Sequence, residues 1–182
     1  MCGRYYLLAG QPKLEEIIQK ARRANRQTAF EIGEIFPGTD APILIGYQHK
    51  IYARFAHWGF YQHIINARSE TVVHKKAFAH DFIYHRALIP VSGFYEWDQY
   101  KKRHAFFYRP NELFYLAGLY NDQREFTILT TQAQPPVSTI HDRMPLIIPK
   151  EKISDWLFDE EKAKSLLSED GNPLVMQPEQ SD

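Results

Sequence analysis

Short runs of apolar residues, many of them aromatic and alternating with polar ones, dominate this chain. Such runs, bounded by turn-forming residues, are typical of strands, and Phe94-Tyr95-Glu96-Trp97 is one example. The same pattern predicts strands at residues 4–8, 43–47, 51–57, 87–91, 94–97, 105–108, 113–116, 125–130 and 144–148.

Helical spacing occurs in fewer places. Pro12 suits the first turn of a helix, and the apolar residues that follow it recur at helical intervals, which predicts a helix over residues 12–24. We expect a further helix at residues 71–80 and one or two within residues 150–167. The fold class is therefore α+β, a β-rich single domain over residues 2–170. The polar stretch at residues 171–182 is predicted to be a loose C-terminal tail.

Composition and charge add to this prediction by excluding some classes of protein. The chain has 182 residues, 44% of them hydrophobic and 24% charged, which is typical of a soluble globular domain. No apolar run reaches the roughly 20 residues of a membrane span, and no secretory signal is recognisable. The single cysteine excludes an internal disulfide and fits a reducing compartment, so we expect a cytoplasmic protein. Zero net charge means that any surface for nucleic acid must be local.

That single cysteine is Cys2, directly after the initiator methionine. One interpretation is a small buried side chain, since free cysteine is among the most buried residue types. The other begins with removal of Met1, which leaves a free α-amine and a thiol on the same residue. Position alone favours the first interpretation.

Four segments carry polar groups that an apolar core does not require. They are Cys2-Gly3-Arg4, Asn66-Ala67-Arg68-Ser69-Glu70-Thr71, Gly93-Phe94-Tyr95-Glu96-Trp97 and His141-Asp142-Arg143-Met144-Pro145. Each has an ordinary explanation: Asn66 or Ser69 as a helix cap, Glu96 as a solvent-facing strand residue, His141 as a structural histidine. The eight histidines show no HxxxH or HExxH spacing and there is no CxxC, so we expect no metal and no cofactor.

Taken together and in this order, the four segments resemble the SRAP family, the SOS-response-associated peptidase domain that shields abasic sites in single-stranded DNA. Trp58-Gly59 and Ile128-Leu129-Thr130-Thr131 are further matches, and the resemblance extends from residue 2 to about residue 158. It implies mostly antiparallel twisted sheets with flanking helices. It also implies single-stranded DNA containing abasic sites as the partner, no membrane, and a monomer.

The implied reaction explains the position of Cys2. An abasic site is in equilibrium with an open-chain aldehyde, and an N-terminal cysteine is a 1,2-aminothiol. Its amine condenses with the aldehyde to a Schiff base, and its thiol then closes a thiazolidine ring. The α-amine has an ordinary pKa near 7.7–8.0, so a useful fraction is neutral at physiological pH.

The resemblance also assigns roles. Glu96 moves protons at the amine, and we expect Tyr95 and Trp97 to raise its pKa. Asn66 holds Cys2 or the sugar oxygens, His141 opens the sugar ring and hydrolyses the Schiff base, and Thr130 seats the α-amine.

Basic and aromatic residues supply the predicted DNA contacts. Cations bind phosphates and aromatic rings stack on bases or wedge between them. The candidates are Arg4, Arg68, Lys76 and Arg143 for phosphates, and Trp58, Phe36 and Pro37 for the bases that flank the abasic site.

Other functions remain open at this point. The same Cys2, Glu96 and His141 would suit self-removal of Met1, and a Cys/His pair is compatible with a thiol peptidase acting on other proteins. A Schiff base also permits β-elimination, which is lyase activity. Finally, the chain would serve as a non-catalytic single-stranded DNA binding module if Cys2 were a passive core residue.

Overall fold

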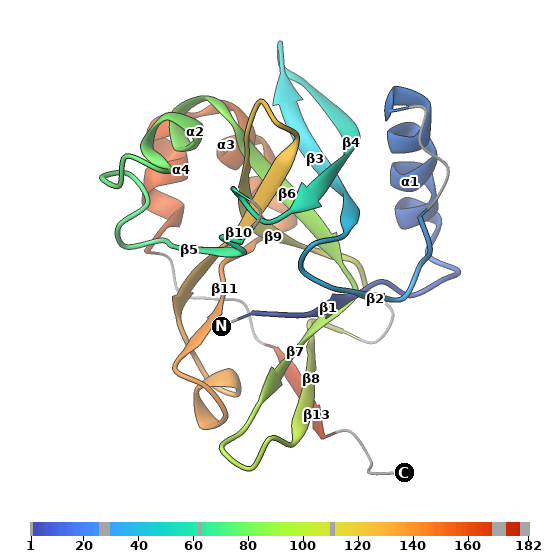
Figure 1. Cartoon of the computed structure of the whole chain (residues 1–182), viewed down its shortest axis with the longest axis vertical. Helices are drawn as coiled ribbons and strands as arrows, with labels where there is room; N and C mark the ends of the chain where they lie inside the picture. The colour runs from blue at the N-terminus through green and yellow to red at the C-terminus, as the bar shows by residue number, and fades with distance from the viewer. Residues whose placement is uncertain (1, 26–29, 62, 110–111, 169–173, 179–182) are drawn as a thin grey trace.

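A computed structural model describes residues 2–25, 30–61, 63–109, 112–168 and 174–178 (Figure 1). It is a β-rich α+β fold, as predicted from the sequence. The strands are β1 (Tyr5–Tyr6), β2 (Glu34–Ile35), β3 (Asp40–Tyr47), β4 (Lys50–Trp58), β5 (Asn66–Arg68), β6 (Arg86–Val91), β7 (Gly93–Trp97), β8 (Arg103–Phe107), β9 (Phe114–Tyr120), β10 (Glu125–Gln132), β11 (Arg143–Pro145), β12 (Ile147–Ile148) and β13 (Val175–Pro178). The helices are α1 (Pro12–Asn25), α2 (Ala79–Tyr84), α3 (Ile153–Phe158) and α4 (Glu160–Leu166), with short 3-10 turns η1 (Val137–Thr139) and η2 (Lys150–Lys152).

The strands form two sheets. The larger one runs β11-β10-β4-β3-β6-β9-β12, and because β10 also pairs with β9, the five strands β10, β4, β3, β6 and β9 close into a ring. Strand β5 joins this sheet through β10. The smaller sheet has the order β13-β8-β7-β1-β2 and lies below the ring (Figure 1). All pairings are antiparallel except those of β10 with β4 and β5, which agrees with the expected mostly antiparallel sheets.

The helices cover the outside of the larger sheet. Helix α1 packs against β3 and β4, while α2, α3 and α4 gather on the other side (Figure 1). The apolar face predicted for α1 is buried at Leu14, Ile17, Ile18 and Ala21. Within the described residues, no helix is long and apolar enough to cross a membrane.

The helix predicted at residues 71–80 is wrong. The chain instead forms turns after Ser69, with the amides of His74 and Lys75 both donating to the carbonyl of Thr71, and α2 begins only at Ala79. The run Thr71-Val72-Val73 is β-branched and loses side-chain freedom in a helix. Val72 is fully buried there, so a turn satisfies the segment better than a helix does.

Two other predictions need smaller corrections, and the prediction of one or two helices within residues 150–167 is confirmed. The strand expected at residues 144–148 is divided into β11 and β12 at Leu146, whose amide bonds Leu129 of β10 while its carbonyl accepts from Ala117 of β9. Residues 150–167 form two α-helices, since the Asp159 side chain caps α4 by accepting from the Lys162 amide. The tail is ordered at Val175–Pro178, which pairs with β8 as β13.

Gly93 allows β1 and β7 of the smaller sheet to pack with the Tyr6 ring against the backbone of β7. It pairs with Tyr6 across β1 and β7. Any Cβ at this position would collide with the Tyr6 ring, so glycine alone allows that ring to pack across the strand. The residues after it, Phe94 to Trp97, therefore keep their register against the N-terminal strand that follows Cys2.

Candidate active site

Cys2 lies where the two sheets meet. It precedes β1 of the smaller sheet, and the side-chain Nδ2 of Asn66, from β5 of the larger sheet, donates to the Cys2 carbonyl oxygen over 2.9 Å. Strand β5 is held parallel to β10, with Asn66 opposite Ile128 and Arg68 opposite Thr130. The sequence prediction that Asn66 holds Cys2 therefore agrees with a contact in the structure, whereas its alternative as a helix cap does not, because Asn66 begins a strand.

The Cys2 side chain is fully buried, and its Sγ lies 4.0 Å from the carbonyl oxygen of Arg4. Burial, and next the negative charge of Glu96, raise the pKa of the Cys2 thiol well above its ordinary value. The thiol is therefore protonated at neutral pH. Burial fits the interpretation of Cys2 as a small core side chain. The polar groups near it, Asn66 and Glu96, fit the interpretation of Cys2 as a reactive residue.

Glu96 points inward from β7. Its side chain is 2% exposed, while Tyr95 and Trp97 on either side of it are half-buried. The interpretation of Glu96 as a solvent-facing residue is wrong. Burial of the carboxylate raises the pKa of Glu96 to about 7, and the charge of Asp142 adds to the shift. The predicted direction is confirmed, but the cause differs: strand alternation places Tyr95 and Trp97 on the opposite face from the carboxylate.

His141 and Asp142 belong to the loop between η1 and β11. His141 Nδ1 accepts a hydrogen bond from the main-chain N–H of Arg143 over 2.9 Å, which favours the tautomer with its proton on Nε2. The Asp142 carboxylate also lies 2.9 Å from Nδ1. Partial burial is the largest cause that lowers the pKa of His141, so the ring is neutral at physiological pH. The negative charge of Asp142 raises the pKa of Glu96, so this loop is electrostatically linked to the carboxylate.

Arg143 was predicted to bind a DNA phosphate, and its side chain is already bound to other groups of the protein. Its guanidinium makes two hydrogen bonds to Glu70, of 2.5 and 2.9 Å, and donates to the carbonyl oxygen of Thr130 over 2.6 Å. The Thr130 side chain is buried, and its hydroxyl lies 3.4 Å from the same guanidinium. Glu70 was not singled out from the sequence, because nothing in the pattern indicates that it reaches across to β11.

Tyr5 is a second residue that the sequence analysis missed. Its ring is fully buried, 5.2 Å from the ring of Trp58. Within the described part of the chain its hydroxyl has no hydrogen-bond partner, and neither has Asn66 Oδ1. Burial raises the pKa of Tyr5, and the charge of Cys2 adds to the effect, so the hydroxyl lies near the thiol. The sequence feature that could have indicated Tyr5 as a site residue is its position directly after Cys2-Gly3-Arg4.

The residues predicted to contact DNA lie in two places: Arg68 and Lys76 are in and after β5, and Arg4 lies beside Phe36 on the smaller sheet. Arg68 and Lys76 are exposed. Arg4 lies on the smaller sheet, with its guanidinium 4.4 Å from the ring centre of Phe36, 5.2 Å from that of Trp97 and 3.4 Å from the carboxylate of Glu34. Phe36 is 42% exposed and Pro37 is exposed beside it. These residues are accessible, and their contacts with DNA remain predictions.

Trp58 is the exception. It is fully buried, stacks on Phe126 at 6.0 Å, and donates its indole N–H to the carbonyl oxygen of Ile65 over 2.9 Å. A side chain in this position has no face left for a base. The prediction that Trp58 stacks on DNA is therefore wrong, and the residue instead anchors β4 to the segment that leads into β5.

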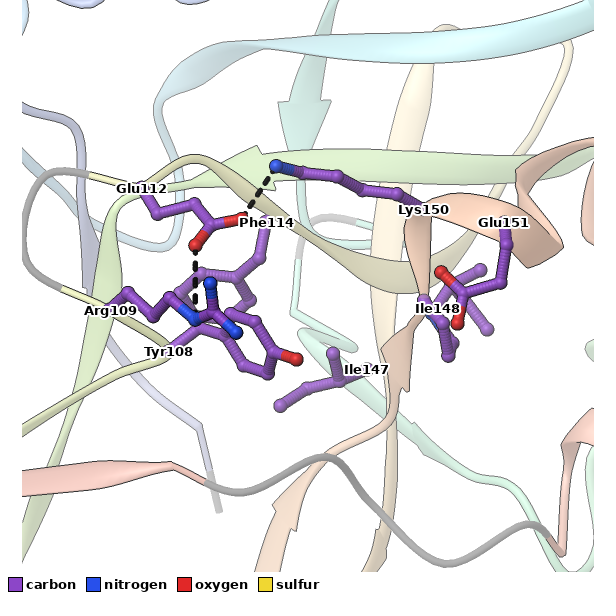
Figure 2. A pocket seen from close by; sticks show the side chains of 9 residues that line it. Tyr108, Arg109, Glu112, Phe114, Ile147, Ile148, Lys150 and Glu151 are labelled. Atoms are coloured by element: carbon purple, nitrogen blue, oxygen red, sulfur yellow. Dashed lines mark hydrogen bonds and ion pairs between the residues drawn. The ribbon is translucent and has the colours of Figure 1, made fainter.

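A separate cavity lies elsewhere in the fold. This cavity has a volume of about 210 Å³. Phe114, Ile147 and Ile148 are among its lining residues (Figure 2). The Glu112 carboxylate at its edge is bound by Lys150 over 2.6 Å and lies 3.7 Å from Arg109. None of the four predicted catalytic residues lines this cavity.

Comparison with known proteins identifies the family of this chain. The family model described as SOS response associated peptidase (SRAP) matches residues 1–179, and the chain belongs to this family. Abasic site processing protein YoqW of Bacillus subtilis is 35% identical over 106 residues, which cover 52% of this chain and 47% of that protein. The chain thus matches about half the length of this relative. Abasic site processing protein YedK of Escherichia coli is 26% identical over 90% of this chain and 82% of its own length.

Solved structures show the same fold. A protein from Bacteroides thetaiotaomicron superposes with a TM-score of 0.79 at 19% identity, covering 100% of this chain and 93% of that one. A phage-related protein from Bordetella bronchiseptica superposes with a TM-score of 0.76 at 22% identity, covering 99% and 95%. At these identities the likeness concerns the fold alone.

Proposed function

We propose that this protein processes abasic sites in single-stranded DNA by capturing them covalently on Cys2. The observation that carries the proposal is the convergence of both sheets on this residue: Asn66 holds its carbonyl, and the buried carboxylate of Glu96 acts on its thiol. The names of the relatives, abasic site processing proteins, point in the same direction. In this proposal Met1 is first removed by hydrolysis of the Met1–Cys2 peptide bond, which the protein performs on itself.

The covalent step follows from the chemistry of the exposed 1,2-aminothiol. The neutral α-amine of Cys2 attacks the aldehyde carbon at C1′ of the open-chain sugar. Loss of one water from the resulting carbinolamine gives the Schiff base. The Cys2 sulfur then adds to the imine carbon, its proton passes to the nitrogen, and the thiazolidine ring closes. The adduct therefore has the summed mass of protein and DNA minus one water.

Glu96 suits the proton transfers in this sequence. A group with a pKa of about 7 exchanges protons readily near neutral pH, where it accepts one from the α-ammonium and returns one to the departing hydroxyl. His141, neutral and with its proton on Nε2, is the second acid/base group. We assign it to opening of the sugar ring and to hydrolysis of the Schiff base. Arg68, Lys76 and Arg4 would bind phosphates along the strand.

A thiol peptidase acting on other proteins fits the site less well. Such an enzyme needs a thiolate, generated by a nearby cation or a lowered pKa. Burial and the charge of Glu96 instead raise the pKa of the Cys2 thiol. The thiazolidine route does not need a free thiolate, since the amine attacks first.

Intact-mass measurement after mixing with single-stranded DNA that contains one abasic site tests the proposal. We expect a heat-stable adduct of protein without Met1, plus DNA, minus one water. Cys2→Ala removes the only thiol of the chain and should abolish the stable adduct while DNA binding persists. A full yield of heat-stable adduct with Cys2→Ala would exclude the thiazolidine. Cleavage of the strand would indicate a lyase instead, and unchanged masses a binding module.

A further inference from the structure

Three groups that can bind a metal ion meet at the end of α2, away from Cys2. One ligand atom from each of His80, Asp81 and His85 lies within 4.8 Å of the other two. His80 and Asp81 are in α2, and His85 is the residue that ends it. These two histidines are five residues apart, a spacing that differs from HxxxH, so the sequence pattern does not reveal them. The helix ends at His85, which allows both rings to turn toward the same carboxylate.

The carboxylate of Asp81 is the centre of this cluster. Its Oδ1 lies 2.7 Å from His85 Nδ1 and 3.3 Å from His80 Nδ1. The main chain supports the first contact, because the amide of His85 donates to the carbonyl oxygen of Asp81 over 2.8 Å. Two ligands of a tetrahedral zinc ion lie about 3.4 Å apart when each bond is about 2.0–2.1 Å long. The 3.3 Å distance from Asp81 to His80 matches that value, whereas the 2.7 Å distance to His85 is shorter. Metal binding therefore requires a small outward shift of the His85 ring from Asp81 and an approach of the two histidines toward each other.

Each of the two imidazole rings has an aromatic neighbour. The His80 ring lies 5.0 Å from that of Tyr84, and the His85 ring lies 4.8 Å from that of Tyr120 on β9. The side chains of Asp81 and His85 are 13% and 18% exposed, while His80 is 67% exposed. The site is therefore anchored on its inner side and accessible from solvent, where His80 is able to move.

Other histidine–carboxylate pairs of the chain provide a comparison. His57 lies 3.2 Å from Asp40, and His104 lies 3.1 Å from Asp98. Among the residues that the structure describes, neither pair has a third ligand within reach, and the group at α2 is the one that does. An ordinary ion pair explains two members but gives no reason for a second histidine beside the same carboxylate.

We propose that His80, Asp81 and His85 bind one divalent transition-metal ion of the zinc class, with water completing its coordination. Two imidazoles and one carboxylate suit zinc, whereas calcium and magnesium prefer an all-oxygen set. His85 lies just before β6, and Glu96 lies beyond the other end of that strand, so the ion takes no part in the chemistry at Cys2. Its effect is to fix the end of α2 and stabilise the fold. This inference is independent of the function proposed for Cys2.

Calorimetric titration of the metal-free Cys2→Ala protein with zinc chloride tests the site, since that background removes the thiol as a competing ligand. We expect one equivalent to bind. His80→Ala should weaken the affinity by at least about ten- to a hundredfold, and its exposed ring makes unfolding an insufficient explanation. Asp81→Asn and His85→Ala should do the same. The matched control is His57→Ala, which removes one histidine of an ordinary pair and should leave the affinity unchanged.

Thermal unfolding gives a second measurement. Zinc at a hundredfold excess over Kd should raise Tm by about 5–10 °C, and a chelator should reverse the rise. The rise should be absent in His80→Ala and present in His57→Ala. The proposal is overturned if no zinc binds, or if His80→Ala binds zinc as tightly as the His57→Ala control does. Equal loss in both variants would also overturn it, because the binding would then be distributed over surface histidines.

Discussion

The side-chain amide of Asn66 donates to the main-chain carbonyl of Cys2 over 2.9 Å, and this bond joins two segments 64 residues apart. It holds the residue before β1 against the first residue of β5, so that the thiol stays between the two sheets. Glu96 reaches the same place from β7.

The first prediction concerns proton transfer by Glu96. Glu96→Gln keeps the shape but cannot accept a proton, so adduct formation should slow by about 10²–10⁴-fold with little change in DNA binding. In the wild-type protein the rate should begin to rise as pH passes through about 7, where Glu96 ionises, whereas the variant should keep only the later rise near pH 7.7–8.0 that comes from deprotonation of the α-amine. Adduct formation followed from pH 6 to 9 measures both. A wild-type rate and pH profile in Glu96→Gln would make the carboxylate a structural group.

The second prediction concerns the stability that the same group provides. Its folded pKa of about 7 lies above the ordinary 4.5, so the folded state holds the proton more tightly than the unfolded state. The corresponding stability is fully present below the unfolded pKa and is lost as pH rises toward 7. Above pH 7, Glu96→Gln should therefore be more stable than wild type by up to about 3 kcal/mol. Urea unfolding at pH 4 and pH 8 measures the difference, and an equal effect at both values would contradict it.

The third prediction separates His141 from Glu96. If the histidine opens the sugar ring and hydrolyses the Schiff base, His141→Ala should slow both formation and reversal of the adduct. Its adduct should then outlive that of the wild type, whereas Glu96→Gln mainly affects formation. A chase with excess competing abasic DNA measures the lifetime. Unchanged reversal in His141→Ala would remove this residue from the hydrolytic step.

The fourth prediction concerns the exposed Arg68. Arg68→Ala should weaken binding to single-stranded DNA and reduce the slope of log K against log salt by about 0.7, the value for one phosphate contact on a single strand. Arg23→Ala on α1 is the matched control, since it removes an exposed arginine from another face. Binding titrations over a range of salt concentrations measure the slope. Equal slopes for Arg68→Ala and Arg23→Ala would move the DNA path elsewhere.

The fifth prediction concerns the Tyr5 hydroxyl, which is buried beside Cys2 without a partner among the described residues. A buried hydroxyl without a hydrogen bond is destabilising, so Tyr5→Phe should stabilise the fold by about 1 kcal/mol. If the hydroxyl binds an oxygen of the sugar in the reacting complex, the variant should also form the adduct more slowly. Chemical unfolding and the adduct time course are measured together. Higher stability at an unchanged rate would make Tyr5 a core residue only.

The sequence by itself determined the fold class, most strands, helix α1 and the chemistry available at Cys2, because apolar periodicity is local and a 1,2-aminothiol depends on position in the chain. It did not determine the turns after Ser69, where a β-branched run and burial of Val72 outweigh the helical pattern. Nor did it decide between the two faces of β7. Alternation says that Glu96 and its neighbours point in opposite directions, but only the packing of the folded chain decides which side of β7 is buried.

Long-range contacts were likewise decided by the tertiary structure alone. Trp58 has the ring that DNA stacking requires, and the closing of the larger sheet buries it against Phe126. Glu70 lies beside Arg143 although 73 residues separate them in the chain. His80 and His85 converge on Asp81 because α2 stops where it does. In each case the side chain and its chemistry can be read from the sequence, while its partner depends on how distant segments pack, which no local pattern records.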